Sequence, residues 1–462
     1  MVFSTQIFLL WFLPIALLGY YALPVRFRTL WLTATSYLFY GWARPEYCLL
    51  LLGVTVLSYV ATARMDAATT PAVRRRWLVA SVTISLGALG FFKYAGMLAT
   101  WLRTTLGWVG LSPDAVPALS IVLPIGISFF TFQAISYTVD VYRGHGRPAR
   151  RFLEYASYIA LFPQLIAGPI VRYEWIEHDL HSRQHSWGKA WLGLRFLGFG
   201  LAKKALLADT FALGVPAGFG PEDPGFVGAW VGTLSYTLQI YFDFSAYSDM
   251  AVGLGLLLGF RFPKNFDSPY RSASITEFWR RWHISLSSFL RDYLYIPLGG
   301  NQRTAVRTYV NLMIVMVLGG LWHGASIVFL LWGFWHGALL AIERALGDRH
   351  PLARLPRPLA IGVTTLLAMI GWVLFRAEDL TMAARVLGAM FWPSSFALPA
   401  LVHPALYALL PLGFAVCWWA PNSWEWAHRA SWGRAVSQAV LIALSLFTVL
   451  AYAQSPFLYF QF

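Results

Sequence analysis

Charged residues are scarce in this sequence. Only 12% of its 462 residues are Asp, Glu, Lys or Arg, whereas a soluble globular domain carries about 25%. Hydrophobic residues make up 58%, and many of them fall in long apolar runs. The mean hydropathy of +0.57 agrees with this pattern. The composition therefore excludes a soluble protein and predicts a multi-pass integral membrane protein.

Acidic residues and cysteines are also few. The sequence has 21 acidic and 35 basic residues, which gives a formal net charge of +14. The Lys and Arg residues stand mainly at the ends of apolar runs, as in cytoplasmic loops beside anionic lipid. Since no basic patch with stacking aromatics stands apart from these runs, we expect membrane lipid and no nucleic acid as a partner. The two cysteines, Cys48 and Cys417, are far apart in apolar runs and fit no metal spacing.

Several catalytic signatures are absent. The sequence has no GxSxG, CxxC, GxxxxGK[ST] or HExxH, so serine-hydrolase, redox, P-loop and zincin chemistry lack support. His178, His181 and His185 follow one another closely, but no helical pattern places them on one face. We interpret them as part of a solvated loop, and we predict no metal site.

The apolar runs predict an all-α protein with about eleven to thirteen membrane segments, several of them too short for the about 20 residues of an upright span. Residues 158–175 carry Pro163, Gly168 and Pro169 within an apolar stretch, which predicts a broken or re-entrant segment buried in protein. No soluble domain and no repeat is visible, so we predict one membrane domain over residues 1–462. The main predicted segments are 2–23, two short spans within 29–60 separated at 42–46, 77–92, 97–109, 119–139, 190–208, 226–260, 359–375, 404–420 and 435–453.

Two carboxylates, Asp243 and Asp249, fall inside the apolar run 226–260. At that depth they must be paired, neutral or exposed to a water-filled cavity. We favour a structural role, in which they bond Ser, Tyr or Arg partners and hold helices together. A functional role stays open.

Residues 273–338 are the central segment on which the function depends. Ser274 and Glu277 match a capping box, so we predict an amphipathic helix that begins there and carries His283 one turn after Trp279. For His283 alone, a satisfied interfacial histidine and a catalytic one remain open interpretations.

His323 lies among Leu, Trp, Gly and Ala, where hydropathy predicts hydrocarbon. An ionisable ring at such a position is costly and suggests function. The neighbouring Gly319, Gly320 and Gly324 would give the ring a clear face. A neutral imidazole accepts a proton from a hydroxyl or thiol near pH 7, which acyl transfer requires. A histidine bonded between helices is the structural alternative.

A set of longer motifs resembles the membrane-bound O-acyltransferase superfamily, and within it the branch of alginate O-acetyltransferases and related polysaccharide O-acetylases. The resemblance covers the chain nearly end to end. It is carried by FFKYAG (91–96), LPIGISFFTFQAISYTVDVYRG (123–144), LFPQLIAGPIVRY (161–173), YFDFSAYSDMAVGLG (241–255), residues 262–301, LGGLWHGAS (318–326), GWVLFRAED (371–379) and SPFLYFQF (455–462).

The resemblance implies a ring of tilted helices and re-entrant segments around a central funnel, with His323 as the catalytic residue and His283 as the second characteristic position. We therefore expect His323 to be reachable from both aqueous sides. It would act as the base for the acceptor hydroxyl or as a transient acyl carrier. Candidate substrate-binding residues are Trp322, Gly324, Asn265, Trp279 and Arg281.

The same resemblance implies an enzyme of the bacterial inner membrane that passes an acetyl group, from acetyl-CoA as donor, to an extracytoplasmic polysaccharide such as alginate. No bound cofactor is expected. A periplasmic acetyltransferase partner and an acyl carrier are the expected proteins in contact with it. Two alternatives stay open: a D-alanyl transferase of the same superfamily acting on teichoic acid, and a transporter or flippase of a lipid-linked intermediate. The second predicts inverted repeats, which the sequence does not show.

Overall fold

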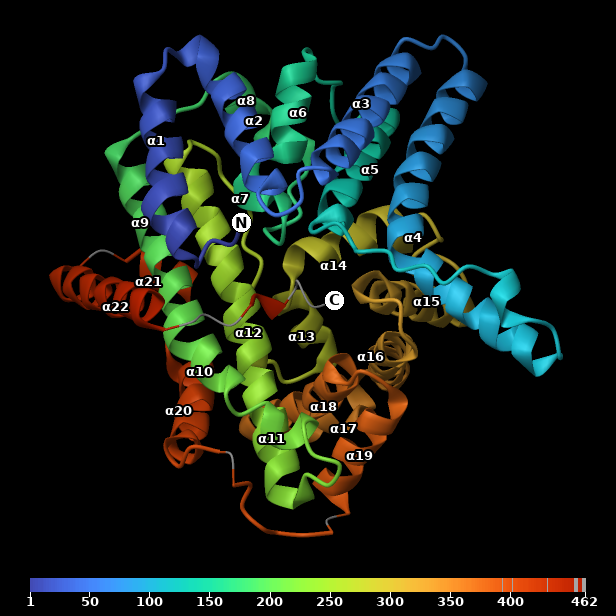
Figure 1. The fold of residues 1–462 in the computed structure, drawn as a ribbon, viewed down its shortest axis with the longest axis vertical. Coiled ribbons are helices and arrows are strands. Elements are labelled where there is room, and N and C mark those ends of the chain that lie inside the picture. The colour runs from blue at the N-terminus through green and yellow to red at the C-terminus, as the bar shows by residue number, and fades with distance from the viewer. Residues whose placement is uncertain (393, 401, 430, 453–455, 459–462) are drawn as a thin grey trace. The chain divides into compact units, whose positions relative to one another are not determined.

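A computed structural model describes residues 1–462 except 393, 401, 430, 453–455 and 459–462. Within the described residues every regular element is a helix, which confirms the all-α prediction (Figure 1). The chain divides into two compact units. The first comprises Met1, Ile7–Lys189 and Gly255–Phe262, and the second Val2–Gln6, Ala190–Leu254 and Pro263–Phe462. The single membrane domain over residues 1–462 stays a prediction.

The first unit is built from short and long helices in chain order. They are η1 (Phe8–Phe12), α1 (Leu13–Ala22), α2 (Val25–Gly41), α3 (Tyr47–Asp66), α4 (Pro71–Trp108), η2 (Pro113–Ala115), α5 (Ile127–Arg143), α6 (Phe152–Ala160), α7 (Phe162–Leu165) and α8 (Tyr173–His181). The predicted break at 42–46 is confirmed, because α2 and α3 are separated there.

Buried hydroxyls join three of these helices. Thr138 Oγ1 of α5 lies 3.0 Å from Thr62 Oγ1 of α3 and 3.0 Å from Ser81 Oγ of α4. Hydrogen bonds of this kind hold helices together where the surroundings offer no water. They fix α3, α4 and α5 against one another in the first unit.

Two predicted boundaries in this unit are wrong. The segments predicted at 77–92 and 97–109 form one helix, α4, of 38 residues. Gly96 lies between them, but glycine only lowers helix propensity and no proline follows Pro71 within the helix. The segment predicted at 119–139 begins later, since α5 starts only after Pro124 and Gly126. Gly126 has φ +78°, a conformation that favours glycine and that interrupts the apolar run.

The broken segment predicted at 158–175 is confirmed. Helix α6 ends at Ala160, the single turn α7 contains Pro163, and α8 starts only at Tyr173. The buried Gln164 donates from Nε2 to the carbonyl of Tyr158, and Tyr158 Oη donates to the carbonyl of Val171. Side chains thus satisfy backbone groups that a regular helix would have paired.

The second unit contains most of α9 and α12 and the elements around residues 273–338. Its elements are α9 (Trp187–Ala202), the π-helical turn η3 (Lys203–Ala208), α10 (Asp209–Ala212), α11 (Pro216–Phe219), α12 (Gly225–Leu257), η4 (Pro269–Arg271), α13 (Ile275–Arg281), α14 (Ile284–Leu290), η5 (Arg291–Tyr295), α15 (Ala305–His323), α16 (Ile327–Leu346), η6 (Gly347–Arg349), α17 (Pro351–Arg354), α18 (Arg357–Arg376), α19 (Leu380–Phe391), α20 (Ala405–Trp419), α21 (Ser423–Ala427) and α22 (Trp432–Ala451).

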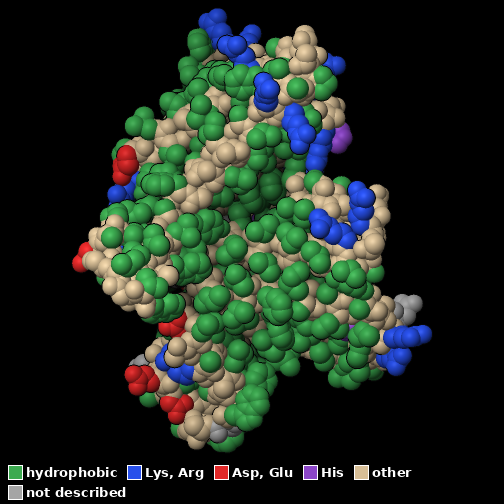
Figure 2. Space-filling model, turned by 90° about the vertical axis from the view of Figure 1, so that its right-hand side faces the viewer, with side chains coloured by type: hydrophobic (Ala, Val, Ile, Leu, Met, Phe, Trp, Pro, Cys, Tyr) green, Lys and Arg blue, Asp and Glu red, His purple; other side chains and the backbone are tan. Residues whose placement is uncertain are grey.

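Six helices of the described residues are long and apolar enough to cross a membrane. The remaining predicted segments correspond to shorter or more polar helices, such as α2 and α5 with 17 residues each. Hydrophobic side chains cover most of the face drawn in Figure 2, and Lys and Arg gather in a few separate groups. An apolar surface of this extent indicates contact with lipid. The six long helices are α3, α4, α15, α16, α18 and α22.

Helices α15 and α16 lie side by side (Figure 1). Their backbones approach closely at two glycines. A Cβ on Gly320 of α15 would overlap the carbonyl oxygen of Phe329, and one on Gly333 of α16 would overlap that of Met316. This close crossing fixes the end of α15, where His323 lies.

The helix predicted from Ser274 begins as expected but does not continue through His283. Ser274 Oγ accepts a hydrogen bond from Glu277 N–H at the start of α13, which confirms the cap. The helix ends at Arg281, and His283 has φ +43°, so the prediction that His283 sits on this helix is wrong. The cause is tertiary: Ile284 N–H donates to the carbonyl of Asn265 (2.9 Å), and Asp267 N–H donates to that of Arg281 (2.9 Å).

Candidate active site

His323 is the last residue of α15, and its side chain is packed among aromatic rings. The residue is 8% exposed. Its ring centroid lies 4.9 Å from Trp322, 5.2 Å from Trp332 and 4.9 Å from Phe375, each in an edge-to-face arrangement. The apolar surroundings predicted for this imidazole are therefore present, and they come from α15, α16 and α18.

His323 lines a cavity of about 20 Å³. Space of that size holds about one water molecule. The imidazole of His323 is the single ionisable group among the described lining side chains. A molecule in this space can therefore exchange a proton with His323 and with no other described lining side chain. The lining is Ile240, Phe244, Trp282, His323, Trp332, Trp372, Phe375, Phe457 and Leu458. The approach from two aqueous sides stays a prediction.

The glycines near His323 serve helix packing. Gly324 is the C-cap of α15, and a Cβ there would overlap the ring of Phe329, as a Cβ on Gly320 would overlap the carbonyl oxygen of Phe329. Gly319 is less confined, with Leu290 Cδ1 3.4 Å from the position of a Cβ. The substrate-binding role predicted for Gly324 stays a prediction.

His283 is buried, with 1% of its surface exposed. Its Nδ1 lies 3.2 Å from Oδ1 of the equally buried Asn265. The same oxygen accepts hydrogen bonds from Ser285 N–H (3.1 Å) and Ser285 Oγ (2.9 Å). Since that atom acts as an acceptor, Nδ1 carries the proton and donates to it, and Nε2 keeps its lone pair. Among the described residues Nε2 has no hydrogen-bond partner.

Burial also sets the charge of His283. Removal from water disfavours the protonated ring and lowers the pKa of His283 to about 3. The side chain is therefore neutral at pH 7, with Nε2 able to accept a hydrogen bond or a proton.

The two predicted histidines share one neighbour. The ring of Trp322 lies 4.9 Å from His323 and 6.3 Å from His283 between centroids. His283 does not line the His323 cavity, although its neighbours Phe244 and Trp282 do. The structure thus places His283 behind the aromatic lining and His323 within it.

The other candidates take separate positions. Trp279 contacts Trp332 (5.6 Å) and a third histidine, the fully buried His336 (5.2 Å). Arg281 pairs with Glu277 Oε1 (2.9 Å) and donates to the carbonyl of Asp267 (3.0 Å). Neither Trp279 nor Arg281 lines the His323 cavity. Their roles in substrate binding stay predictions.

The sequence did not single out most of the aromatic lining. Trp332 follows His323 on the next helix, and Trp372 and Phe375 come from the motif at 371–379. Phe457 and Leu458 belong to the motif at 455–462, of which only residues 456–458 lie within the described residues. These motifs supported the family resemblance, but nothing in them indicated that they meet at His323.

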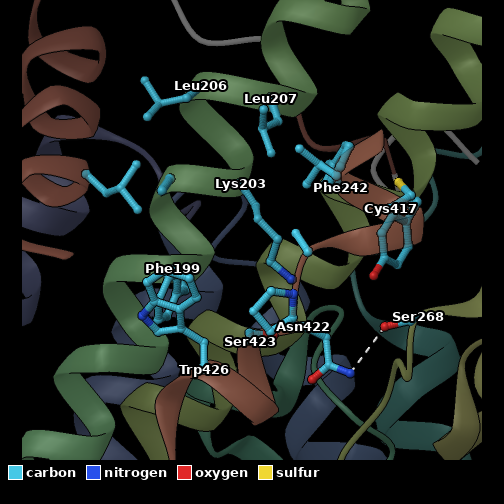
Figure 3. Close-up of a pocket in the computed structure, with 16 residues that line it drawn as sticks. Phe199, Lys203, Leu206, Leu207, Phe242, Ser268, Cys417, Asn422, Ser423 and Trp426 are labelled. Atoms are coloured by element: carbon cyan, nitrogen blue, oxygen red, sulfur yellow. Dashed lines mark hydrogen bonds between the residues drawn. The ribbon is translucent and has the colours of Figure 1, made fainter. Parts of the chain in front are cut away.

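A second cavity, of about 240 Å³, lies elsewhere in the second unit (Figure 3). Its lining is mainly apolar and includes Lys203, Ser268, Cys417 and Asn422, with Asn422 Nδ2 donating to Ser268 Oγ (3.2 Å). No histidine stands among its described lining residues. Although it is larger, we take the His323 cavity as the candidate active site, because an imidazole is the group suited to proton transfer near pH 7.

The interpretation of His178, His181 and His185 as loop residues is wrong for the first two, which lie in the last turn of α8. The three histidines have separate partners. His178 Nδ1 lies 3.8 Å from Asp179, His181 Nδ1 lies 3.4 Å from Glu154, and His185 Nε2 lies 3.0 Å from Tyr20 Oη. Across the described part of the chain, no three His, Cys, Asp or Glu side chains come together as a metal site.

Comparison with known proteins identifies the family of this chain. The model of the membrane-bound O-acyltransferase family matches residues 149–368, a range that contains both His283 and His323. A Pseudomonas putida protein named a probable alginate O-acetylase is 43% identical over 491 aligned residues, which cover 100% of both chains. The chain belongs to the membrane-bound O-acyltransferase family. It is therefore a multi-pass membrane protein and an acyltransferase.

Two further relatives bear on the branch of the membrane-bound O-acyltransferase family. A Pseudomonas aeruginosa protein, also named a probable alginate O-acetylase, is 48% identical over 392 residues, 85% of this chain and 75% of its own length. A Helicobacter pylori peptidoglycan O-acetyltransferase is 34% identical over 520 aligned residues, 100% of this chain and 98% of its own. The similarity to the alginate branch confirms the resemblance found in the motifs.

Proposed function

We infer that this acyltransferase passes an acetyl group from a cytoplasmic donor, acetyl-CoA, across the membrane for O-acetylation of an extracytoplasmic polysaccharide such as alginate. The observation that carries the proposal is the His323 imidazole, the single ionisable group among the described lining residues of an aromatic cavity in an acyltransferase. The names of the full-length relatives support acetate as the group and alginate as the acceptor.

The proposed chemistry uses the lone pair of the His323 ring. As a base, the imidazole takes the proton of an acceptor hydroxyl while the hydroxyl oxygen attacks the acyl carbon. The carbon–sulfur bond of the donor thioester then breaks, and the imidazolium returns its proton to the leaving thiolate. In the alternative the unprotonated ring nitrogen attacks the acyl carbon, the carbon–sulfur bond breaks, and the thiolate leaves with the proton of the other ring nitrogen. The acceptor hydroxyl then attacks the acyl-imidazole, the carbon–nitrogen bond breaks, and the hydroxyl proton returns to the ring. His283, neutral and with Nε2 as an acceptor, would orient the donor or the acceptor.

The cavity beside His323 has room for about one water molecule, so neither the acetyl thioester nor a sugar fits without movement of the lining. A handover in which the acetyl group leaves on a small carrier or a partner would keep the polymer itself outside this cavity. We therefore propose a periplasmic acetyltransferase as the partner that modifies the polymer, and the bacterial inner membrane as the location. An acyl carrier is a further proposed partner.

Paired histidine substitutions test the proposal. His323→Phe and His336→Phe each replace an imidazole with an apolar ring, and both residues contact Trp332. We expect His323→Phe to lower acetyl transfer from labelled acetyl-CoA at least 100-fold, because a positioned base contributes about 10²–10⁴. His336→Phe should stay within threefold, since the described residues give neither nitrogen of His336 a hydrogen-bond partner.

Both variants are compared at equal amounts of folded, membrane-inserted protein. Normal transfer by His323→Phe would remove this residue from the mechanism. Transfer of labelled D-alanine in place of acetate would assign the chain to D-alanylation, and flux of a lipid-linked intermediate without acyl transfer would assign it to transport.

A further inference from the structure

Two lysine–aspartate pairs lie in the second unit, in which Lys204 and both aspartates are buried and Lys203 is partly exposed. Lys203 and Lys204 are adjacent in η3, and their partners Asp249 and Asp243 both lie on α12. Lys204 Nζ is 2.9 Å from Asp243 Oδ1 and 2.8 Å from Asp209 Oδ1. Lys203 Nζ is 2.5 Å from Asp249 Oδ2 and 3.0 Å from Ser245 Oγ. The proposed acyl transfer uses none of these charges.

Asp243 makes one contact that sets it apart. Its second oxygen, Oδ2, accepts a hydrogen bond of 2.7 Å from the backbone N–H of Leu458. Hydrogen bonds to a carboxylate are about twice as strong as neutral ones. Asp243 and Lys204 are 1% and 2% exposed, so this bond is shielded from competing water.

The residues held in this way form part of the His323 cavity. Phe457 and Leu458 both line it, and Phe457 stacks on Tyr247 of α12 at 4.7 Å between ring centroids. We call residues 456–458 the wall segment. Leu458 is 215 residues from Asp243 in sequence, so the place of the wall segment in the cavity depends on tertiary contacts.

We propose that Asp243 is a positioning residue for the acyl-transfer site: its carboxylate, oriented by Lys204, holds the wall segment against the His323 cavity. The effect on transfer rests on the proposed function, whereas the anchoring itself does not. The sequence suggested a structural role for Asp243, and the group that Asp243 holds is the backbone N–H of Leu458.

An Asp243→Asn substitution breaks this contact selectively. Lys204 donates to the Oδ1 side of residue 243, so the amide oxygen of the substituted side chain turns toward Lys204 and its NH₂ group faces Leu458 N–H. Two donors then oppose each other. Lys204 keeps Asp209 as a counterion, so no uncompensated charge is created.

Asp249→Asn is the matched control. It also removes a buried carboxylate of the same helix that pairs with a lysine, and Lys203 keeps Ser245 as an acceptor. Within the described residues no hydrogen bond joins Asp249 to the wall segment. Lys203 instead lines the second cavity, where Figure 3 shows it.

The first experiment measures access to the wall segment in the purified full chain in detergent. Leu458→Cys is introduced with Cys48→Ala and Cys417→Ala, and the rate of reaction with N-ethylmaleimide is followed. We expect Asp243→Asn to raise the rate at least tenfold and Asp249→Asn to change it less than twofold. An unchanged rate in Asp243→Asn, or an equal rise in both variants, would overturn the proposal.

The second experiment measures acetyl transfer per folded protein, with both cysteines native and no labelling site. Asp243→Asn should lower transfer at least tenfold and Asp249→Asn less than threefold. Faster labelling with normal transfer would show that the wall segment is anchored but does not position the site, which also overturns the proposal. If the parent protein transfers no acetyl group at all, the proposed function fails, and the labelling experiment still decides the anchoring.

Leu458→Pro provides an independent variant should Asp243→Asn not accumulate. Proline lacks the N–H donor, so the bond is lost while Lys204, Asp209 and Asp243 remain intact. With Phe457→Cys as the reporter, the same tenfold rise in labelling is expected. Labelling of this variant at the parent rate would refute the role of the bond.

Discussion

The hydrogen bond between His283 and Asn265 leads to a quantitative prediction. Asn265 Oδ1 is the acceptor for three buried donors: Ser285 N–H, Ser285 Oγ–H and His283 Nδ1–H. The last of these keeps the proton on Nδ1 and leaves Nε2 free to accept. Asn265→Ala removes the acceptor and leaves all three donors in place.

The loss of stability in Asn265→Ala follows from the number of hydrogen bonds that the substitution removes. A hydrogen bond contributes about 1 kcal/mol to stability, so Asn265→Ala should lower the free energy of unfolding by about 3 kcal/mol. About 1 kcal/mol of this concerns the tautomer of His283, which corresponds to roughly fivefold in population. If Nε2 of His283 must accept a hydrogen bond during transfer, the rate of acetyl transfer should fall about fivefold.

Ser285→Ala is the control, because it deletes one hydroxyl and keeps the His283 bond. It should cost about 1 kcal/mol and leave the rate within twofold. The assay is the initial rate of acetyl transfer, normalised to folded protein, with thermal unfolding in detergent measured on the same samples. Equal rates in the two variants, or full activity of Asn265→Ala, would refute the tautomer argument.

Two further predictions concern the packing around His323 and the titration of His283. Gly320→Ala places a Cβ against the carbonyl of Phe329 and should destabilise the protein by about 1–3 kcal/mol in thermal unfolding. Gly319→Ala, with Leu290 Cδ1 3.4 Å from its Cβ, should be neutral or stabilising. Equal effects of the two substitutions would contradict the close α15–α16 crossing. The pKa of His283 is about 3 in the folded protein and about 6.5 when unfolded, so between these values only the unfolded chain binds the proton and stability falls as the pH is lowered. From pH 6.5 to pH 5 the free energy of unfolding should fall by about 2 kcal/mol, and His283→Asn should abolish this fall. If the unfolding free energies of the two proteins changed equally with pH, a neutral, buried His283 would be contradicted.

Much of the fold follows from local patterns. Apolar runs predicted the helical membrane protein, Pro45 and its neighbours predicted the separation of α2 from α3, and Ser274 with Glu277 predicted the start of α13. Each of these signals acts within a few residues. His323 was found in the same way, because an ionisable ring in an apolar run is visible without any tertiary information.

The remaining features depend on contacts between distant residues. His283 leaves the helix because the loop at Asn265 and Asp267 takes the hydrogen bonds that would have continued it. The aromatic cavity gathers side chains from α12, α16, α18 and the wall segment, which no periodicity relates. The sequence did not decide whether α4 is one helix or two, because a weak interruption in an apolar run is compatible with both.

The narrow space beside His323 bears on how an activated acetyl group survives. Hydrolysis of a thioester or an acyl-imidazole competes with every transfer and needs a water molecule near the carbonyl carbon. A pocket of about 20 Å³ walled by indole and phenyl rings admits about one such molecule and offers it few polar contacts. If His323 transfers an acetyl group as proposed, dense aromatic packing would limit hydrolysis of the donor and favour transfer to the acceptor hydroxyl.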